Sequence, residues 1–279
     1  MPEGRLTMTA KGESERFESG ASKYAAYLET PEGRLRSDLA FANLQDFFPS
    51  KPRTSLRALD LGGGTGATAI RLAQLGIHVT LLDSSRAMLE IAESAAHEAG
   101  IADEVIVQLG DATRLASLFP PRSFDLILCH NVLEFLDESG ALLSAAASSL
   151  RDSSAILSVL VRSQAGEVFK AAIQAGDLAV AENNLTSEWA QESLYGGQTR
   201  IFSPDRLQAL FRAASLEVIA ERGVRVLADY LPPSVSRSKD YKRIFELERK
   251  LGNRPEYAAV ARYTHSLARC TNLAAEDRA

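Results

Sequence analysis

A glycine-rich segment, Asp60-Leu61-Gly62-Gly63-Gly64-Thr65-Gly66, contains the residue types that bring a backbone close to a ligand. Its alternate glycines follow an apolar run and precede a run with helical spacing. Because glycine has no side chain, the backbone there can approach a bound molecule and adopt conformations that other residues avoid. The segment predicts a ligand-binding turn, although a tight connection between a strand and a helix can have the same composition.

Two aspartates lie where they could complete such a site. Asp83 ends the next apolar run, 17 residues after Gly66, and Asp111 follows the run after that. Because parallel strands present their carboxyl ends at one edge of a sheet, both carboxylates are expected beside the glycine turn. There Asp83 could accept hydrogen bonds from ribose hydroxyls, and Asp111 could contact an adenine amino group. Each aspartate alone is equally consistent with a helix cap or a solvated carboxylate.

The elements that would position these residues alternate between strands and helices. Apolar runs indicate strands over 56–61, 79–82, 105–109, 124–129 and 156–161, and helical spacing fills the intervals. This alternation predicts an α/β fold with a doubly wound, Rossmann-like, mostly parallel sheet. Beyond residue 162 the rhythm breaks. We expect helical insertions near 163–200 and 228–255, with further strands over 216–227 and 257–268.

The composition excludes several classes of protein. The chain has 279 residues, 46% of them hydrophobic, and a formal net charge of −5, which argues against a protein that binds nucleic acid over its whole surface. Two cysteines, Cys129 and Cys270, offer neither a disulfide framework nor a metal-binding spacing. The first residues lack the apolar core of a signal peptide, and no apolar run is long enough for a membrane span. We therefore expect a cytoplasmic protein without a membrane segment or a metal.

The spacing Asp-x-Gly-x-Gly-x-Gly in 60–66 differs from the Gly-x-Gly-x-x-Gly of dinucleotide-binding enzymes. With a helical segment before the first strand and a strand at its end, 50–270 resembles the class I S-adenosylmethionine-dependent methyltransferases. The resemblance implies a seven-stranded sheet with an antiparallel last strand, and S-adenosyl-L-methionine as the cofactor. It also implies that the cofactor contacts the following residues: Asp60, Gly62, Gly63, Gly64, Gly66, Asp83, Ser84, Asp111 and Ala112.

Further segments are similar to the bacterial tRNA 5-carboxymethoxyuridine methyltransferases, which esterify a carboxylate on a modified wobble uridine. The segments that carry this likeness are 33–36, 129–135, 223–231, 241–248, 254–257 and 261–265. The likeness implies that Arg36 contacts the cofactor's carboxylate and that His130 contacts the cofactor or the acceptor. On the residues alone, Arg36 is equally a surface helix arginine and His130 a structural residue at a strand end.

Residues 223–255 carry eight Lys or Arg residues and four Asp or Glu residues, a surplus of +4 in a chain of net charge −5. Tyr230 and Tyr241 lie among these charges, and aromatic rings beside cations suit an unstacked RNA base. A solvated amphipathic helix from about 239 to 250 has the same pattern. We predict that Arg200, Arg225 and Tyr230 position the acceptor.

These observations give three hypotheses. The first is a methyltransferase acting on a carboxylate in the anticodon loop of tRNA. The second is a methyltransferase of a small carboxylic acid or an acyl-carrier substrate, and the third is a protein that binds the cofactor without catalysis. In each, residues 1–50 form a helical arm over the cofactor site, with a frayed start over 1–16. Residues 51–270 form the main domain and 271–279 a disordered tail.

Overall fold

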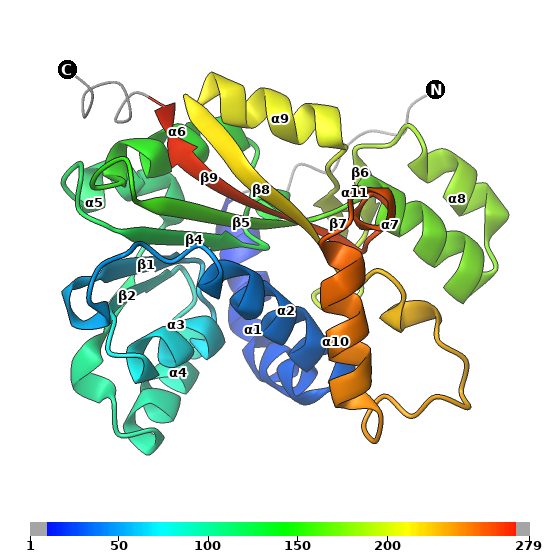
Figure 1. The fold of residues 1–279 in the computed structure, drawn as a ribbon, viewed down its shortest axis with the longest axis horizontal. Helices are drawn as coiled ribbons and strands as arrows, with labels where there is room; N and C mark the ends of the chain where they lie inside the picture. Colours follow the sequence, from blue (N-terminus) through cyan, green and yellow to red (C-terminus); the bar gives the residue numbers. More distant parts are fainter. Residues whose placement is uncertain (1–9, 272–279) are drawn as a thin grey trace.

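The computed structural model describes residues 10–271 and contains a central seven-stranded sheet (Figure 1). The strand order is β3-β2-β1-β4-β5-β9-β8. The strands are β1 (Arg57–Leu61), β2 (His78–Asp83), β3 (Val105–Leu109), β4 (Leu126–His130), β5 (Ile156–Arg162), β8 (Leu216–Val224) and β9 (Tyr263–Cys270). Strands β1 to β5 are parallel, and β9 runs antiparallel to both β5 and β8. The predicted fold, including an antiparallel last strand, is confirmed.

Helices cover both faces of the sheet (Figure 1). One face packs on α2 (Pro31–Gln45), α3 (Ala67–Gln74) and α4 (Arg86–Glu98), and the other on α5 (Leu115–Leu118), α6 (Ser139–Ser149) and α9 (Pro204–Ala213). Along β4, Leu126 and Leu128 belong to the core on the side of α2, α3 and α4, whereas Ile127 and Cys129 belong to the core on the side of α5, α6 and α9. Burial on both faces explains why these strands are continuous apolar runs rather than alternating ones.

The chain begins with two helices, α1 (Ala10–Glu29) and α2. The expected frayed start is wrong from Ala10 onward, and residues 1–9 lie outside the described residues. The break between the two helices lies at Thr30, and Gly33 belongs to α2. Thr30 caps α2 by accepting the Gly33 N–H at 3.1 Å, and Gly33 packs so tightly that a Cβ there would lie 2.0 Å from the Tyr27 carbonyl oxygen.

The insertion after β5 contains α7 (Gln164–Phe169), a π-helical turn η5 (Lys170–Ala175) and α8 (Leu178–Asn184). A two-stranded antiparallel ribbon follows, formed by β6 (Trp189–Gln191) and β7 (Gln198–Arg200). The sequence predicted a helical insertion here. Strands of three residues are too short to show a period, so the ribbon was not predicted.

The second insertion follows β8 and contains α10 (Tyr241–Gly252) and α11 (Pro255–Ala258). The predicted charged helix is therefore present, and Arg249 of α10 pairs with Asp46 at 3.1 Å. The final strand begins at Tyr263, later than expected, because α11 occupies the preceding residues. The predicted disordered tail lies almost wholly outside the described residues. The remaining short 3₁₀ turns are η1 (Arg53–Ser55), η2 (Ala102–Glu104), η3 (Ala112–Arg114), η4 (Leu133–Phe135) and η6 (Ala228–Tyr230).

Within residues 10–271, no helix combines the length and the apolar character that a membrane crossing requires. Over the same range, no group of three or more His, Cys, Asp or Glu side chains is arranged to hold a metal ion. Both cysteines are buried and free.

Candidate functional site

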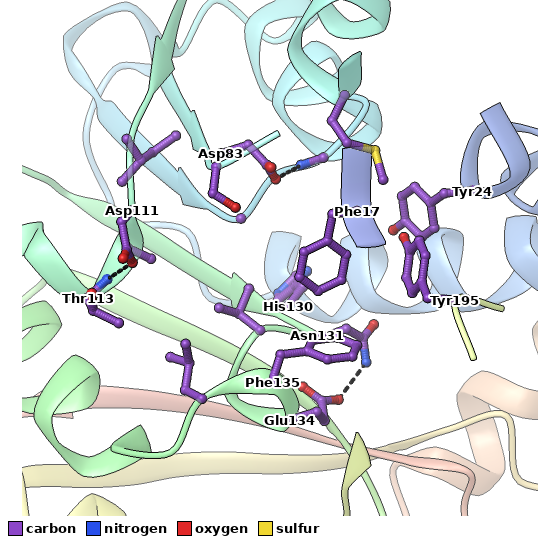
Figure 2. Close-up of a pocket in the computed structure, with 18 of the residues that line it drawn as sticks. Phe17, Tyr24, Asp83, Asp111, Thr113, His130, Asn131, Glu134, Phe135 and Tyr195 are labelled. Atoms are coloured by element: carbon purple, nitrogen blue, oxygen red, sulfur yellow. Dashed lines mark hydrogen bonds between the residues drawn. The ribbon is translucent and has the colours of Figure 1, made fainter. Parts of the chain in front are cut away.

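A cavity of about 410 Å³ opens at the carboxyl ends of β1, β2 and β4. Its wall combines residues from α1, the glycine turn, the ends of these strands and the loop between β6 and β7 (Figure 2). A volume of this size lies within the usual range for small-molecule sites, and open α/β sheets bind ligands at this edge.

The glycine turn forms one side of the cavity. Gly62 has φ +60°, and a Cβ there would lie 2.6 Å from the Val132 side chain, so a larger residue does not fit. The Gly64 N–H donates to Oδ2 of Asp83 at 2.9 Å, which ties the turn to the end of β2. The turn is therefore closely packed, with its backbone facing the cavity.

Eight of the eleven residues predicted to bind the cofactor line this cavity: Arg36, Gly62, Gly64, Asp83, Ser84, Asp111, Ala112 and His130. Asp60 and Gly63 instead line a smaller adjoining hollow, which shares Gly62 and His130 with the cavity. Gly66 lines neither hollow. It precedes α3 with φ +77°, and a Cβ there would lie 3.0 Å from Ala92 of α4, so close packing accounts for this glycine.

The carboxylates at the strand ends lie on one side of the cavity (Figure 2). Asp83 also accepts the Ser85 N–H at 2.9 Å, and the Ser85 side chain caps α4. Burial raises the pKa of Asp83, although its backbone hydrogen bonds oppose the shift. Burial, together with the neighbouring Asp83, raises the pKa of Asp60 to about 7. Asp111 is exposed and accepts the Thr113 N–H at 2.8 Å, so it also caps the turn that follows it.

Arg36 is a buried cation without a carboxylate partner among the described residues. Its Nη2 donates to the Tyr24 hydroxyl at 3.0 Å, and the rings of Tyr24, Tyr27 and Tyr263 surround its guanidinium. Burial opposes the charge, but these tyrosines outweigh it and raise the pKa of Arg36. A permanently charged guanidinium that faces the cavity and has no acidic partner among the described residues fits the carboxylate of a bound amino acid.

His130 lies at the end of a buried hydrogen-bonded chain. Its Nε2 is 2.8 Å from Ser158 Oγ, which is 2.8 Å from Nε2 of His265, and Nδ1 of His265 is 3.4 Å from Asn43 Nδ2. Burial and the nearby Arg36 lower the pKa of His130 to about 3. The imidazole that faces the cavity is therefore neutral at physiological pH and is a weak base.

Aromatic side chains form the opposite wall, which the sequence analysis did not identify. The rings of Phe17 and Phe135 lie 5.0 Å apart, those of Phe17 and Tyr195 5.1 Å apart, and those of Tyr24 and Tyr195 6.1 Å apart (Figure 2). Tyr195 comes from the loop of the β6–β7 ribbon. The sequence offers only the aromatic residues of the N-terminal arm and of the 189–195 stretch as signals, and aromatic residues are equally common in a hydrophobic core.

None of the three residues predicted to position the acceptor lines the cavity. The Arg225 guanidinium is buried against Asp229 and donates from Nη1 to the Tyr27 hydroxyl at 3.1 Å, so its charge is already paired. Arg200 lies on β7 with its guanidinium 4.8 Å from the Trp189 ring centroid. Tyr230 lies in η6, outside the cavity wall. The geometry does not support these three assignments.

Cavity residues that sequence analysis missed include Asn131, Glu134, Arg162 and Glu192. Asn131 has a left-handed backbone with φ +56° and donates from Nδ2 to Oε1 of Glu134 at 2.9 Å (Figure 2). Burial raises the pKa of Glu134. The segment 129–135 carried part of the family likeness, which is the one sequence signal that pointed to Asn131 and Glu134.

Comparisons with known proteins agree with this geometry. Residues 58–153 match a family model described as a methyltransferase domain. The chain is 29% identical over 261 residues to tRNA 5-carboxymethoxyuridine methyltransferase of Escherichia coli (strain K12), covering 91% of this chain and 95% of that protein. It is 25% identical over 256 residues to the ubiquinone biosynthesis O-methyltransferase of Chelativorans sp. (strain BNC1), covering 86% and 93%. The solved CcbJ methyltransferase from Streptomyces caelestis superposes with a TM-score of 0.63 at 17% identity, covering 92% and 98%.

The matched methyltransferase domain and the full-length relative support a class I S-adenosylmethionine-dependent methyltransferase, and the strand order and the glycine turn at the end of β1 agree with it. The protein is therefore an enzyme, and its cofactor is S-adenosylmethionine. Within this class, the chain resembles tRNA 5-carboxymethoxyuridine methyltransferase over nearly its whole length.

Proposed function

We propose that this enzyme O-methylates a carboxylate carried by a modified wobble uridine of tRNA. The observation that carries the carboxylate part is the composition of the cavity. Its wall includes two arginines, Arg36 and Arg162, and His130, which has a pKa lowered to about 3. Such a site suits an anionic acceptor better than an alcohol or amine that must first lose a proton.

The residues present fit the cofactor. Arg36 would hold its carboxylate, Asp83 its ribose hydroxyls, and Asp111 with Ala112 its adenine, with the glycine turn beside the methionyl part. When bound, S-adenosylmethionine supplies a methyl group on a sulfonium, and transfer to a carboxylate oxygen forms an O–C bond, breaks the C–S bond and leaves that electron pair on sulfur. The protein contributes alignment and exclusion of water.

An ionised acceptor removes the need for a general base. Carboxyl groups have pKa values of about 4, so the acceptor is already an anion near pH 7. A neutral His130 is consistent with this chemistry because it adds no positive charge beside a sulfonium. The aromatic wall of Phe17, Tyr24, Phe135 and Tyr195 offers faces on which a uracil ring could stack.

The similarity to the tRNA enzyme supports the tRNA part of the proposal, and so does the position of the basic insertion. Strand β8 has the same direction as β5, so the segment that follows β8 emerges at the end of the sheet that holds the cavity. Arg225, Asp229 and Glu248 are buried, which leaves at the surface seven cations and two carboxylates within 223–255. A basic face of this kind suits a phosphate backbone.

A small carboxylic acid is the second candidate acceptor. The formal net charge of −5 favours it, because an acidic protein repels the phosphates of a nucleic acid except where basic residues cluster.

A methyl-transfer assay tests the proposal. Purified enzyme and methyl-labelled S-adenosylmethionine are offered bulk tRNA from cells that lack this protein, and separately a panel of small carboxylic acids. We expect label in tRNA and none in the acids. Label in an acid with none in tRNA would establish the second candidate and refute the first.

A further inference from the structure

Arg162, the last residue of β5, is one of two cations that line the cavity within residues 10–271; the other is Arg36. Its backbone N–H donates to Oε1 of Glu134 at 2.9 Å, which fixes the main chain at the cavity wall. Its side chain is 14% exposed and ends beside the loop of the β6–β7 ribbon. With Arg36 suited to the cofactor's carboxylate, Arg162 is the cation that remains for the acceptor.

Two carboxylates, Glu167 and Glu192, pair with Arg162, and they differ in the other partners that they have. Glu167 lies 3.4 Å from Nη1, but it also pairs with Arg262 at 3.1 Å and Lys170 at 3.8 Å. Glu192 lies 3.0 Å from Nη2 and is 2% exposed. Glu167 therefore keeps two cations if Arg162 turns to another partner.

Glu192 comes from the ribbon loop rather than from the sheet. Besides Arg162, it lies 3.7 Å from Arg16 and accepts the backbone N–H groups of Leu194 and Tyr195. These contacts are retained if only its bond to Arg162 is exchanged. Glu192 therefore lines the cavity and pairs there with the Arg162 guanidinium, although it belongs to a segment outside the central sheet.

We propose that Arg162 binds the carboxylate of the methyl acceptor and that Glu192 occupies this position until the acceptor replaces it; this inference rests on the proposed function. Exchange of one carboxylate for another keeps the buried guanidinium paired, whereas an uncompensated buried cation is costly. A neutral analogue offers no replacement anion and leaves Glu192 in place. The exchange therefore selects acceptors that carry a negative charge.

Direct binding measurements test the assignment without turnover. Calorimetry with 5-carboxymethoxyuridine and with its neutral methyl ester, in the presence of S-adenosylhomocysteine, separates recognition of the charge from recognition of the ring. In Arg162→Met we expect affinity for the acid to fall at least 30-fold and affinity for the ester to change less than threefold. In Glu192→Gln we expect the acid to bind several-fold more tightly, because its competitor has lost its charge.

Arg206→Met is the matched control. Arg206 is ion-paired with Glu188 next to the ribbon but does not line the cavity, so its loss should leave both ligands unaffected. S-adenosylhomocysteine affinity and Tm show whether each variant is folded. Should Arg162→Met not fold, Arg162→Lys, which keeps the charge without the planar fork, carries the test together with Glu192→Gln.

The outcomes separate the two proposals. A wild-type enzyme that methylates carboxylate-bearing tRNA, with Arg162 variants that bind the acid as the wild type does, overturns the role of Arg162 and leaves the proposed function standing. Equal losses for acid and ester in Arg162→Met also overturn that role, because the side chain would then only shape the cavity. A wild-type enzyme that binds neither ligand and methylates no tRNA contradicts both.

Discussion

Arg36 carries a positive charge in a place where burial opposes it. The side chain sits among three tyrosine rings and has a hydrogen bond to Tyr24, but no acidic side chain of the described residues neutralises it. Leaving a buried charge unpaired costs folding free energy, so a binding role explains the residue better than a structural one. Removing the Arg36 charge should therefore weaken cofactor binding without lowering the stability of the protein.

In Arg36→Met, we expect cofactor affinity to fall about tenfold to 100-fold, which corresponds to the loss of hydrogen bonds to a charged group. We expect Tm to stay the same or rise. Calorimetric titration with S-adenosylhomocysteine and a thermal melt check the two effects. Arg34→Met is the control, since Arg34 is 66% exposed on the same helix. A lower Tm with unchanged affinity would show that Arg36 is structural.

His130 predicts a pH dependence of stability. Its pKa is lowered to about 3 in the folded protein from an ordinary value of about 6.5, so the unfolded chain binds more protons between these values. The resulting stabilisation is fully present above pH 6.5 and is lost as the pH falls toward 3, at up to about 1.4 kcal/mol per pH unit.

Buried acids with raised pKa values, such as Asp60, have the opposite effect on stability. The contribution of His130 must therefore be obtained by comparing the wild type with a variant that lacks this histidine. The free energy of unfolding of the wild type minus that of His130→Asn should decrease between pH 6.5 and 4.5. Urea denaturation at several pH values checks this. A difference that is independent of pH would mean that His130 titrates normally in the folded protein.

At the scale of elements, the sequence predicted what local patterns encode. The apolar runs of the seven strands and the turn at 60–66 are contiguous, so periodicity and glycine spacing were enough. The pairing of Arg162 with Glu192 depends on the ribbon meeting β5 in space, 30 residues further along the chain, and no local pattern records it. The assignment of Arg225 to the acceptor has the same limit, because the sequence does not show that Asp229 already pairs with Arg225.

The α1–α2 packing predicts a steric effect at Gly33. A methyl group there meets backbone rather than a flexible side chain, so Gly33→Ala should lower the free energy of unfolding by about 1–3 kcal/mol despite the higher helix propensity of alanine. Urea denaturation measures it. Gly100→Ala serves as a comparison, because Gly100 has φ +69° but nothing within 4 Å of its Cβ position. Any destabilisation of that variant therefore reports backbone strain alone. A stabilised Gly33→Ala would contradict this packing.

The basic helix α10 predicts a salt-dependent effect on tRNA. Lys242 and Arg243 are exposed, and replacing both by Gln should weaken tRNA binding and reduce the slope of log affinity against log salt by about 1.4, the value for two single-strand phosphate contacts. Filter binding at several salt concentrations measures the slope. The pair Arg122→Gln and Arg212→Gln, also exposed, removes the same charge elsewhere. Equal effects of both pairs would show that only total charge matters.

For the whole molecule, the net charge argues against binding to tRNA, whereas the distribution of charge favours it. The chain is acidic overall, but buried acids account for part of that charge, and exposed cations gather after β8 at the end of the sheet that holds the cavity. An enzyme with this arrangement can be acidic and still dock one loop of tRNA on one face. Its cavity and its basic helix then serve a single substrate.

The chemical nature of the methylated product tests this account most directly. A methyl ester is hydrolysed by mild alkali, whereas a methyl group on nitrogen, on carbon or on an ether oxygen is not. After reaction with methyl-labelled S-adenosylmethionine, tRNA from cells lacking the protein should carry label that mild alkali releases as methanol, and nucleoside mass spectrometry should place it on a wobble uridine. Alkali-stable label, or label elsewhere in the tRNA, would contradict the proposed carboxylate chemistry.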